Sequence, residues 1–309
     1  MKTVFECDKV VFDVDWSPDG RYLAIVGASR ELVLLKIDDE DPFNVTEVFR
    51  EQRPNIIRRV HWSPDGKRLV TAGFDGVAVL YEFDEDKQPV LEMIGNLYEN
   101  DKELKSARWS HSGKYIVTCN RDKSIFVWDV EELEYIVIHT EHKGDVKDVM
   151  FSPDDSKLVS VSFDGTVKVW SSMEEYGSLQ TFTHHTYTVW ELAFDNENDE
   201  FVTIGEDGKA VHYIEEDGKY IDAGEIQLNR PLDCLYAVTY RNGEWLISGV
   251  DHKIYIMNDT FEEKIGEFDT GQLGDINCIK PNPEKQNIIA VASDDGTVLL
   301  IDHELSSIY

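Results

Sequence analysis

The sequence predicts an all-β fold, a seven-bladed propeller with four strands in each blade that the N-terminal strand closes into a ring. Three observations lead to this prediction. A motif that begins with an aromatic residue recurs about every 44 residues, and seven such units account for the 309 residues. An aspartate follows the aromatic residue at a nearly fixed distance. Each unit consists of short apolar runs separated by turns, and no segment keeps a helical apolar period, so strands are expected.

The repeated motif sets the boundaries of the units. It reads WSPDG at 16–20 and 62–66, WSHSG at 109–113, FSPDD at 151–155 and FDNEN at 194–198. Two weaker copies follow, YRNGEWLISG from Tyr240 and NPEKQNIIAVAS from Asn282. We therefore expect a single domain over residues 1–309. Its repeats are expected at about 10–40, 54–86, 100–131, 142–173, 185–215, 230–259 and 273–305.

A turn aspartate lies thirteen residues after the leading aromatic residue in four consecutive units, as Asp75, Asp122, Asp164 and Asp207. Ser29 takes its place in the first unit. Asp251 and Asp295 fill the same role in the last two units, with the spacing shifted by about one residue. Where glycine follows, the Asp-Gly pair between two apolar runs favours a β-hairpin turn. The aspartate therefore marks a tight turn between two strands of each blade.

The last unit is one strand short. Its final apolar run, GTVLLIDHE, corresponds to a third strand, and the sequence after it is too short for a fourth. Residues 3–6 form an apolar run before the first unit. We expect this run to complete the last blade, which would close the ring and protect the edges of the sheets.

Composition and charge restrict the classes of partner. The chain contains 61 acidic and 30 basic residues, a formal charge of −31, so its surface repels nucleic acids and anionic membranes. It has no apolar run of about 18 residues and no apolar core of a signal peptide. The four cysteines are dispersed, without a CxxC pair. We expect no nucleic-acid or membrane binding, and no metal ion or other cofactor.

The units resemble WD40 repeats, and the Trp-Asp dipeptide itself occurs once, at Trp128-Asp129. In that family the turn aspartate accepts hydrogen bonds from a histidine of the preceding loop, which Ser or Thr links to the tryptophan. The resemblance implies a structural network of this kind in three units. Its expected members are His142, Ser160, Asp164 and Trp170 in the fourth unit, His185 and Asp207 in the fifth, and Asp122 and Trp128 in the third.

A His/Ser/Asp set also permits a catalytic interpretation. Every member of this one occupies a repeated position, which favours a structural role, because satisfied buried polar networks specify a fold. An enzyme would require carboxylates or metal ligands that converge in the central channel, and the repeat positions do not provide such a cluster. We therefore expect no enzymatic activity.

A basic, aromatic patch is expected on the upper face, the side of the ring that carries the turn aspartates. In WD40 proteins the residue four positions before the leading aromatic residue and the residue before the turn aspartate commonly reach this face. By this analogy, the partner-binding residues are Arg58, Lys105, Lys147 and Trp190 at the first position, and Phe74, Arg121 and Phe163 at the second.

The predicted ligand of this patch is an acidic peptide segment. Arginine suits bidentate capture of a carboxylate, and aromatic side chains suit an apolar neighbour of the acid. The alternative is that these side chains are scattered, solvated residues without a common ligand.

Residues 118–195 resemble the WD40 subunit of the cytosolic iron–sulfur protein assembly targeting complex. The similarity lies in TCNRDKSIFVWDVEELEY, HKGDVKDVMFSPDDSKLVSVSFDGTVKVW and HTYTVWELAFD, and it extends weakly through all seven units. The resemblance implies a scaffold that joins a cluster-delivering complex to apo-proteins in the cytosol and nucleus. The functional arginine of the family's RDK motif maps onto Arg121. Units one, six and seven depart from the pattern, which puts their partner surfaces in doubt.

The same resemblance implies specific partners. They are a helical-repeat scaffold and a small acidic-motif subunit of the targeting complex, an iron-only-hydrogenase-like cluster carrier, and apo iron–sulfur client proteins. The chain is accordingly expected in the cytoplasm and also in the nucleus. The alternative function is that of another WD40 interaction scaffold, in signalling, in a ubiquitin ligase as substrate receptor, or in histone chaperoning.

Overall fold

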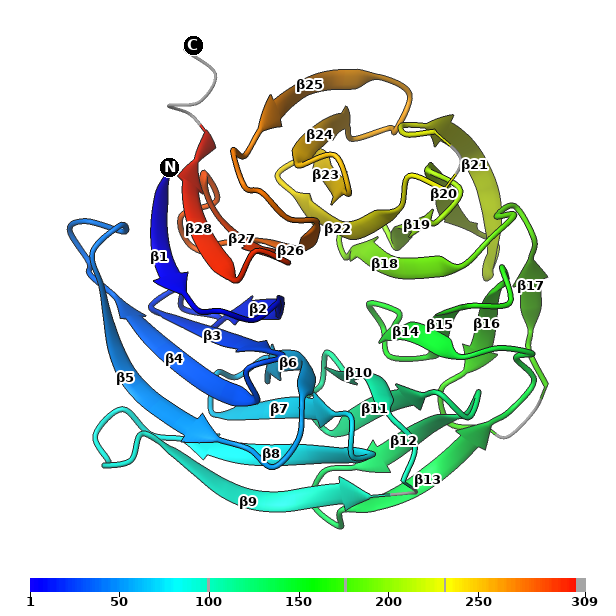
Figure 1. Ribbon diagram of the computed structural model, residues 1–309. Helices are drawn as coiled ribbons and strands as arrows, with labels where there is room; N and C mark the ends of the chain where they lie inside the picture. The colour runs from blue at the N-terminus through cyan, green and yellow to red at the C-terminus, as the bar shows by residue number, and fades with distance from the viewer. Residues whose placement is uncertain (99–100, 175–176, 231, 304–309) are drawn as a thin grey trace.

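A computed structural model describes residues 1–98, 101–174, 177–230 and 232–303. Seven four-stranded antiparallel sheets surround a central axis like the blades of a propeller (Figure 1). The predicted all-β propeller with seven blades is thus confirmed. The expected start of the third repeat at residue 100 and the expected end of the seventh at 305 lie outside the described residues.

Each blade runs from an innermost to an outermost strand in chain order, except the seventh. Blade one contains β2 (Val11–Trp16), β3 (Tyr22–Gly27), β4 (Glu31–Ile37) and β5 (Val45–Gln52). Blade two contains β6 (Ile57–Trp62), β7 (Arg68–Gly73), β8 (Val77–Phe83) and β9 (Leu91–Tyr98). Blade three contains β10 (Leu104–Trp109), β11 (Tyr115–Asn120), β12 (Ile125–Asp129) and β13 (Glu134–His139). Blade four contains β14 (Val146–Phe151), β15 (Lys157–Ser162), β16 (Val167–Ser171) and β17 (Gln180–Phe182).

Blades five to seven continue this order. They contain β18 (Val189–Asp195), β19 (Glu200–Gly205), β20 (Lys209–Glu216) and β21 (Lys219–Gln227); β22 (Leu235–Arg241), β23 (Glu244–Gly249), β24 (Lys253–Asn258) and β25 (Lys264–Asp269); and β26 (Ile276–Pro281), β27 (Ile288–Ser293), β28 (Thr297–Asp302) and β1 (Lys2–Glu6).

The N-terminal strand closes the ring, as predicted. β1 is the outermost strand of the seventh blade and pairs antiparallel with β28, with Lys2 opposite Leu300 and Glu6 opposite Thr297. Phe5 points into the core between blades one and seven and is 9% exposed. The first strand of the chain therefore lies beside β28, the last strand of the described residues (Figure 1).

The blades pack face to face, so their central strands are buried on both sides. β3 and β27 are buried at every residue, which explains why these runs are continuously apolar rather than alternating. The leading aromatic residues also link neighbouring blades. The Trp16 indole N–H donates to the Lys280 carbonyl at 2.9 Å, and that of Trp109 to the His61 carbonyl at 3.1 Å.

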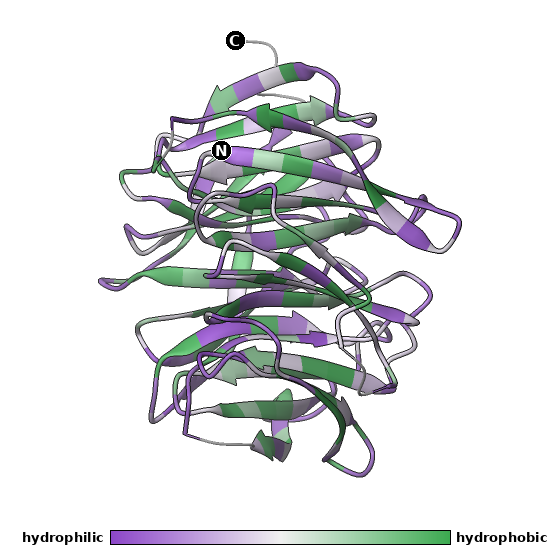
Figure 2. Ribbon diagram, turned by 90° about the vertical axis from the view of Figure 1, so that its right-hand side faces the viewer, coloured by the Kyte–Doolittle hydropathy of each residue, from purple (hydrophilic) through white to green (hydrophobic). Residues whose placement is uncertain are grey.

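The two faces of the ring differ in their turns. The turns between second and third strands, which carry the turn aspartates, lie on the upper face together with the segments that enter the innermost strands. The Ser-Pro-Asp-Gly turns lie at the opposite ends of the strands, on the lower face. Viewed from the side, the connecting turns at both faces are mostly hydrophilic (Figure 2). In the described part of the chain, no helix has the length and apolar content that a membrane crossing requires.

Candidate functional site

The fourth blade contains the predicted hydrogen-bond network. His142 Nδ1 lies 3.0 Å from Asp164 Oδ2, and His142 Nε2 lies 2.8 Å from Ser160 Oγ. The Trp170 indole N–H donates to the same Ser160 oxygen at 2.8 Å. His142, Ser160 and Trp170 are buried. This arrangement leaves no open side for a substrate, so it fits a structural role.

The fifth blade repeats the network with one change. His185 bonds Asp207 at 3.0 Å and Thr203 Oγ1 at 2.9 Å, so threonine stands where the fourth blade has serine. The third blade has a shorter version. The Trp128 indole donates to Thr118 Oγ1 at 2.8 Å, and Asp122 accepts from the Ser124 backbone N–H at 3.1 Å. These residues hold the turns that support the upper face.

Replacement of His142 by alanine is expected to destabilise the fold without acting on partner binding directly. The change leaves Asp164 short of a donor and removes the histidine partner of Ser160, which costs about 1–3 kcal/mol of the free energy of unfolding. Urea denaturation of His142→Ala measures this loss, with Lys143→Ala as control because its side chain is exposed. Unchanged stability combined with lost partner binding would show that His142 belongs to a binding site.

The upper face gathers six of the seven predicted partner-binding residues around the mouth of the channel. Cations and aromatic rings pack against one another there in an arc. Each cation lies over the face of a neighbouring ring. The distances from the charged group (Arg Cζ or Lys Nζ) to the ring centroid are 4.6 Å for Arg58 and Phe12, 5.5 Å for Lys105 and Phe74, 5.4 Å for Lys147 and Phe163, and 4.9 Å for Lys147 and Trp190. We call this set, with Tyr236 at its end, the cationic–aromatic arc.

Arg121, the seventh predicted residue, lies at the outer edge of the arc. Its side chain is 61% exposed, and its Nη1 lies 3.6 Å from a Glu103 carboxylate oxygen. The other oxygen of Glu103 accepts from Lys105 Nζ at 2.6 Å. Glu103 therefore couples Arg121 to the arc, but Arg121 makes none of the ring contacts. Its exposure is that of a residue at the rim of an interface.

The cations of the arc are crowded and partly desolvated. Burial lowers the pKa of Lys147, and the neighbouring Lys105 and Arg58 lower it further, against the opposing effect of Asp145. Burial, with Arg59 nearby, lowers the pKa of Arg58 to about 10. With this pKa, Arg58 stays charged at neutral pH. An incoming carboxylate would relieve the mutual repulsion of these cations, which is the electrostatic basis for an anionic ligand.

Two members of the arc were not among the predicted site residues. Phe12 stacks on Phe74 with ring centroids 6.3 Å apart, and Tyr236 packs edge-on against Trp190 at 5.4 Å. Tyr236 lies four residues before Tyr240, the leading aromatic residue of the sixth unit. The offset that located Trp190 therefore also locates Tyr236, but the weak motif of the sixth unit conceals it.

One expectation about the channel is wrong, because carboxylates do converge in it. Asp13, Asp148 and Glu191 are buried on three innermost strands. Arg59 lies 3.5 Å from Asp13 and 3.1 Å from Glu191, and it thereby joins blades one, two and five. Arg108 bonds Asp148 at 2.8 Å and lies 3.6 Å from Glu191. We call these five residues the channel cluster.

The channel cluster is built of ion pairs rather than of free acids. Burial by itself would raise the pKa of Asp148, but Arg108 and Arg59 lower it to about 2. Burial raises the pKa of Glu191, whose Oε2 also accepts from the Val238 backbone N–H at 3.0 Å. The two arginines form ion pairs with all three carboxylates. The cluster therefore links neighbouring and opposite blades and fits a structural role.

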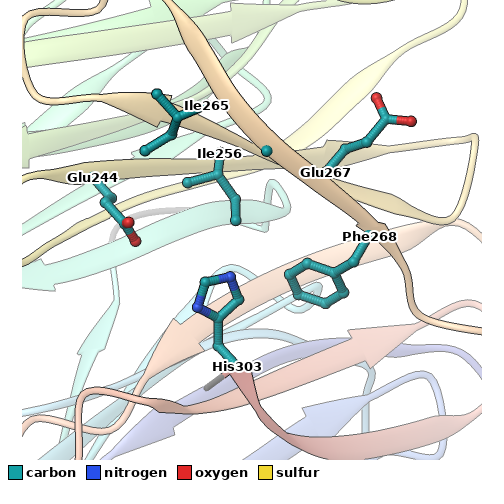
Figure 3. A pocket seen from close by; sticks show the side chains of 7 residues that line it. Glu244, Ile256, Ile265, Glu267, Phe268 and His303 are labelled. Carbon is teal, nitrogen blue, oxygen red and sulfur yellow. The ribbon is translucent and has the colours of Figure 1, made fainter. Parts of the chain in front are cut away.

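No group of three or more His, Cys, Asp and Glu side chains within the described residues is arranged to hold a metal ion. One cavity, of about 200 Å³, lies away from the predicted residues, beside β23, β24 and β25 of blade six and His303, which follows β28 of blade seven (Figure 3). Its lining includes Ile265, Phe268 and His303. The Glu267 carboxylate at its edge is already paired with Lys253 and Lys264, at 2.7 and 2.6 Å.

Comparison with known families matches the repeats directly. The family model described as "WD domain, G-beta repeat" matches residues 2–33, 45–82, 91–129, 134–171 and 263–302, which is more than half of the chain.

The chain is also similar to individual proteins. "Probable cytosolic iron-sulfur protein assembly protein 1" of Neurospora crassa is 30% identical over 33% of this chain and 30% of that protein. "Transcriptional corepressor LEUNIG_HOMOLOG" of Arabidopsis thaliana is 23% identical over 62% of this chain and 24% of that protein. "Protein HIRA" of Homo sapiens is 30% identical over 29% of this chain and 11% of that protein. The chain thus spans less than a third of each of these relatives.

Proposed function

We propose that this chain, which belongs to the WD40 repeat family, is a non-catalytic scaffold of cytosolic iron–sulfur protein assembly that links a cluster-delivery complex to apo-protein clients. The observation that carries the proposal is the cationic–aromatic arc, a basic surface on a body with a formal charge of −31. The similarity to proteins named for cytosolic iron–sulfur protein assembly supports the choice of process.

The arc would bind an acidic segment of a partner protein. The net charge of the body repels such a segment at long range, so attraction arises only close to the arc. There, Lys105 and Lys147 would face the acid while the rings of Phe163 and Trp190 take up an apolar neighbour. Phe163 is 60% exposed, so it has a large apolar area to bury on binding.

The partners follow from the same proposal. They are the helical-repeat scaffold and the small acidic-motif subunit of the targeting complex, the iron-only-hydrogenase-like cluster carrier, and the apo iron–sulfur clients. We place the protein in the cytoplasm and the nucleus. The second candidate is another WD40 interaction scaffold, because the similarity to the transcriptional corepressor extends over 62% of this chain, although at lower identity.

Depletion of the protein in the cell that encodes it tests the proposal. Iron bound to a cytosolic iron–sulfur enzyme should fall after depletion, while iron bound to a mitochondrial one stays constant. Wild-type protein should restore the cytosolic value. Unchanged cluster content in cytosolic enzymes after depletion would exclude the proposed process and favour the second candidate.

Charge reversal at Arg121 is expected to weaken the binding of an acidic partner while stability is retained. Arg121 is exposed and at the rim, so Arg121→Glu should act mainly on the association rate and cost about 1 kcal/mol of binding free energy. A titration with a labelled acidic peptide at two salt concentrations measures this. Lys114→Glu is the matched control, since it reverses a charge on the lower face of the same blade. Equal affinities of the two variants would remove Arg121 from the site.

A further inference from the structure

A cavity of about 210 Å³ opens at the mouth of the channel, inside the cationic–aromatic arc. Five blades contribute to its wall. The rings of Phe12, Trp190 and Tyr236 form the apolar part, and Arg58 and Arg59 lie between them. The side formed by blade seven is polar and carries Asp275, Asn277 and Asp294.

Several N–H groups of the residues that line this cavity lack a hydrogen-bond acceptor among the described residues. No hydrogen bond or ion pair joins the Arg58 guanidinium to any described residue, and its Cζ lies 4.6 Å from the centroid of the Phe12 ring. Arg59 is 4% exposed and pairs through its two terminal nitrogens, but its Nε has no hydrogen-bond partner among the described residues.

The indole N–H of Trp190 is a further hydrogen-bond donor without an acceptor within the described ranges, and its nitrogen is buried. The neighbouring Cys234 thiol is a weak acceptor and makes no geometrically defined hydrogen bond with it. A buried donor without an acceptor is destabilising, so a ligand oxygen that accepts a hydrogen bond from it would be favoured.

The charge of the opposite wall limits what the ligand can be. Asp294 is fixed by a hydrogen bond from Asn277 Nδ2 at 2.6 Å, and Asp275 stands beside it. Asp294 raises the pKa of Asp275, after the larger effect of burial, so the two carboxylates are close enough to repel. These two carboxylates would repel a dianion such as phosphate more strongly than a single carboxylate. A single carboxylate can also point toward the arginine side of the cavity, away from Asp275 and Asp294.

We propose that the mouth of the channel is a binding site for one carboxylate of a protein segment, held by Arg58, Arg59 Nε and Trp190 Nε1. The rings of Phe12 and Tyr236 take an apolar side chain next to the acid. This inference rests on the proposed function, because the acid belongs to the segment that the arc recruits. It goes further in naming the bound group and the three donors.

The carboxylate can belong to a side chain or to a chain terminus, and three peptides distinguish these sources. The first, acetyl-Gly-Glu-Phe-Gly-amide, carries only a side-chain acid. The second, acetyl-Gly-Gln-Phe-Gly with a free C-terminus, carries only a terminal acid. The third, acetyl-Gly-Gln-Phe-Gly-amide, carries none and reports the contribution of the phenyl ring.

The readout is the indole N–H resonance of Trp190 in a ¹H–¹⁵N spectrum, identified among the seven tryptophans by its loss in Trp190→Phe. At least one acidic peptide should shift this resonance downfield, as expected for a new hydrogen bond, while the uncharged peptide should not. Arg58→Met should weaken the acidic peptide at least tenfold and leave the uncharged peptide unaffected. Lys67→Met, on the lower face, is the control, and thermal melts verify that each variant is folded.

The outcomes separate this inference from the proposed function. An acidic peptide that binds wild type and Arg58→Met equally, without moving the Trp190 resonance, would overturn the channel-mouth site and leave an acid-binding arc in place. Absence of binding by both acidic peptides would overturn the site as well. The depletion experiment tests the cellular role independently of either result.

Discussion

Deletion of residues 1–8 is expected to lower the free energy of unfolding by at least about 4 kcal/mol. The deletion removes β1 and with it Phe5, and loss of a buried phenylalanine side chain alone costs about 3–5 kcal/mol. It also exposes the edge of β28, which would then be open to pairing with other chains. Denaturation midpoints and the fraction of soluble protein measure the two effects.

Point variants within the same strand provide the comparison. Phe5→Ala should account for a large part of the loss, because this side chain packs in the core between blades one and seven. Thr3→Ala should be almost neutral, because Thr3 is exposed and its backbone pairing with Leu299 is retained. A truncated protein that melts within about two degrees of the full chain would contradict the role of β1 as the closing strand.

Replacement of Arg108 by methionine is expected to cost about 3–5 kcal/mol, the usual penalty for breaking a buried ion pair on one side only. Asp148 is fully buried and would keep its negative charge without its main partner, and Glu191 would lose one of its two arginines. Urea denaturation of the purified variant measures this loss.

The double variant Arg108→Met/Asp148→Leu tests whether the loss of stability comes from the buried, unpaired charge of Asp148. Replacement of a whole buried pair by apolar groups is often neutral, so this variant should regain most of the stability that Arg108→Met loses. If the double variant is as unstable as the single one, the penalty arises from lost packing rather than from the uncompensated carboxylate.

The fold was predictable because each unit carries the same short motifs at nearly the same spacing. Trp16, Trp62 and Trp109 each end an innermost strand, and the turn aspartates each open the next hairpin. The last unit has three apolar runs, and the apolar run at residues 3–6 supplies its fourth strand, β1. These inferences require only the order of strands along the chain.

The channel cluster was not predictable in the same way. Its members lie three residues, or one residue, before the leading aromatic residue, at positions that vary between charged, polar and apolar from unit to unit. Arg59 and Glu191 are 132 positions apart in the sequence and meet only because the ring brings blades two and five across the channel. A linear pattern shows that such residues face inward, but closure of the ring decides which charges meet.

The arc lies between these two cases. Positional offsets placed Arg58, Lys105 and Lys147 on the upper face, because each unit repeats the same backbone path. The offsets could not show that Lys147 lies between two rings, or that Arg121 is at the rim with Glu103 beside it. Those details depend on side-chain packing between neighbouring blades.

Quantitative co-purification tests the central claim most directly. Wild type, the double variant Lys105→Gln/Lys147→Gln and the lower-face control Lys114→Gln would be expressed at equal levels in the native cell, and their partners compared by mass spectrometry. We expect cytosolic iron–sulfur assembly proteins and apo-clients with wild type and with the control, and a loss of at least several-fold of the clients from the double variant. Partners unrelated to iron–sulfur proteins, or clients retained equally by all three chains, would contradict the claim that the upper face links cluster delivery to its clients.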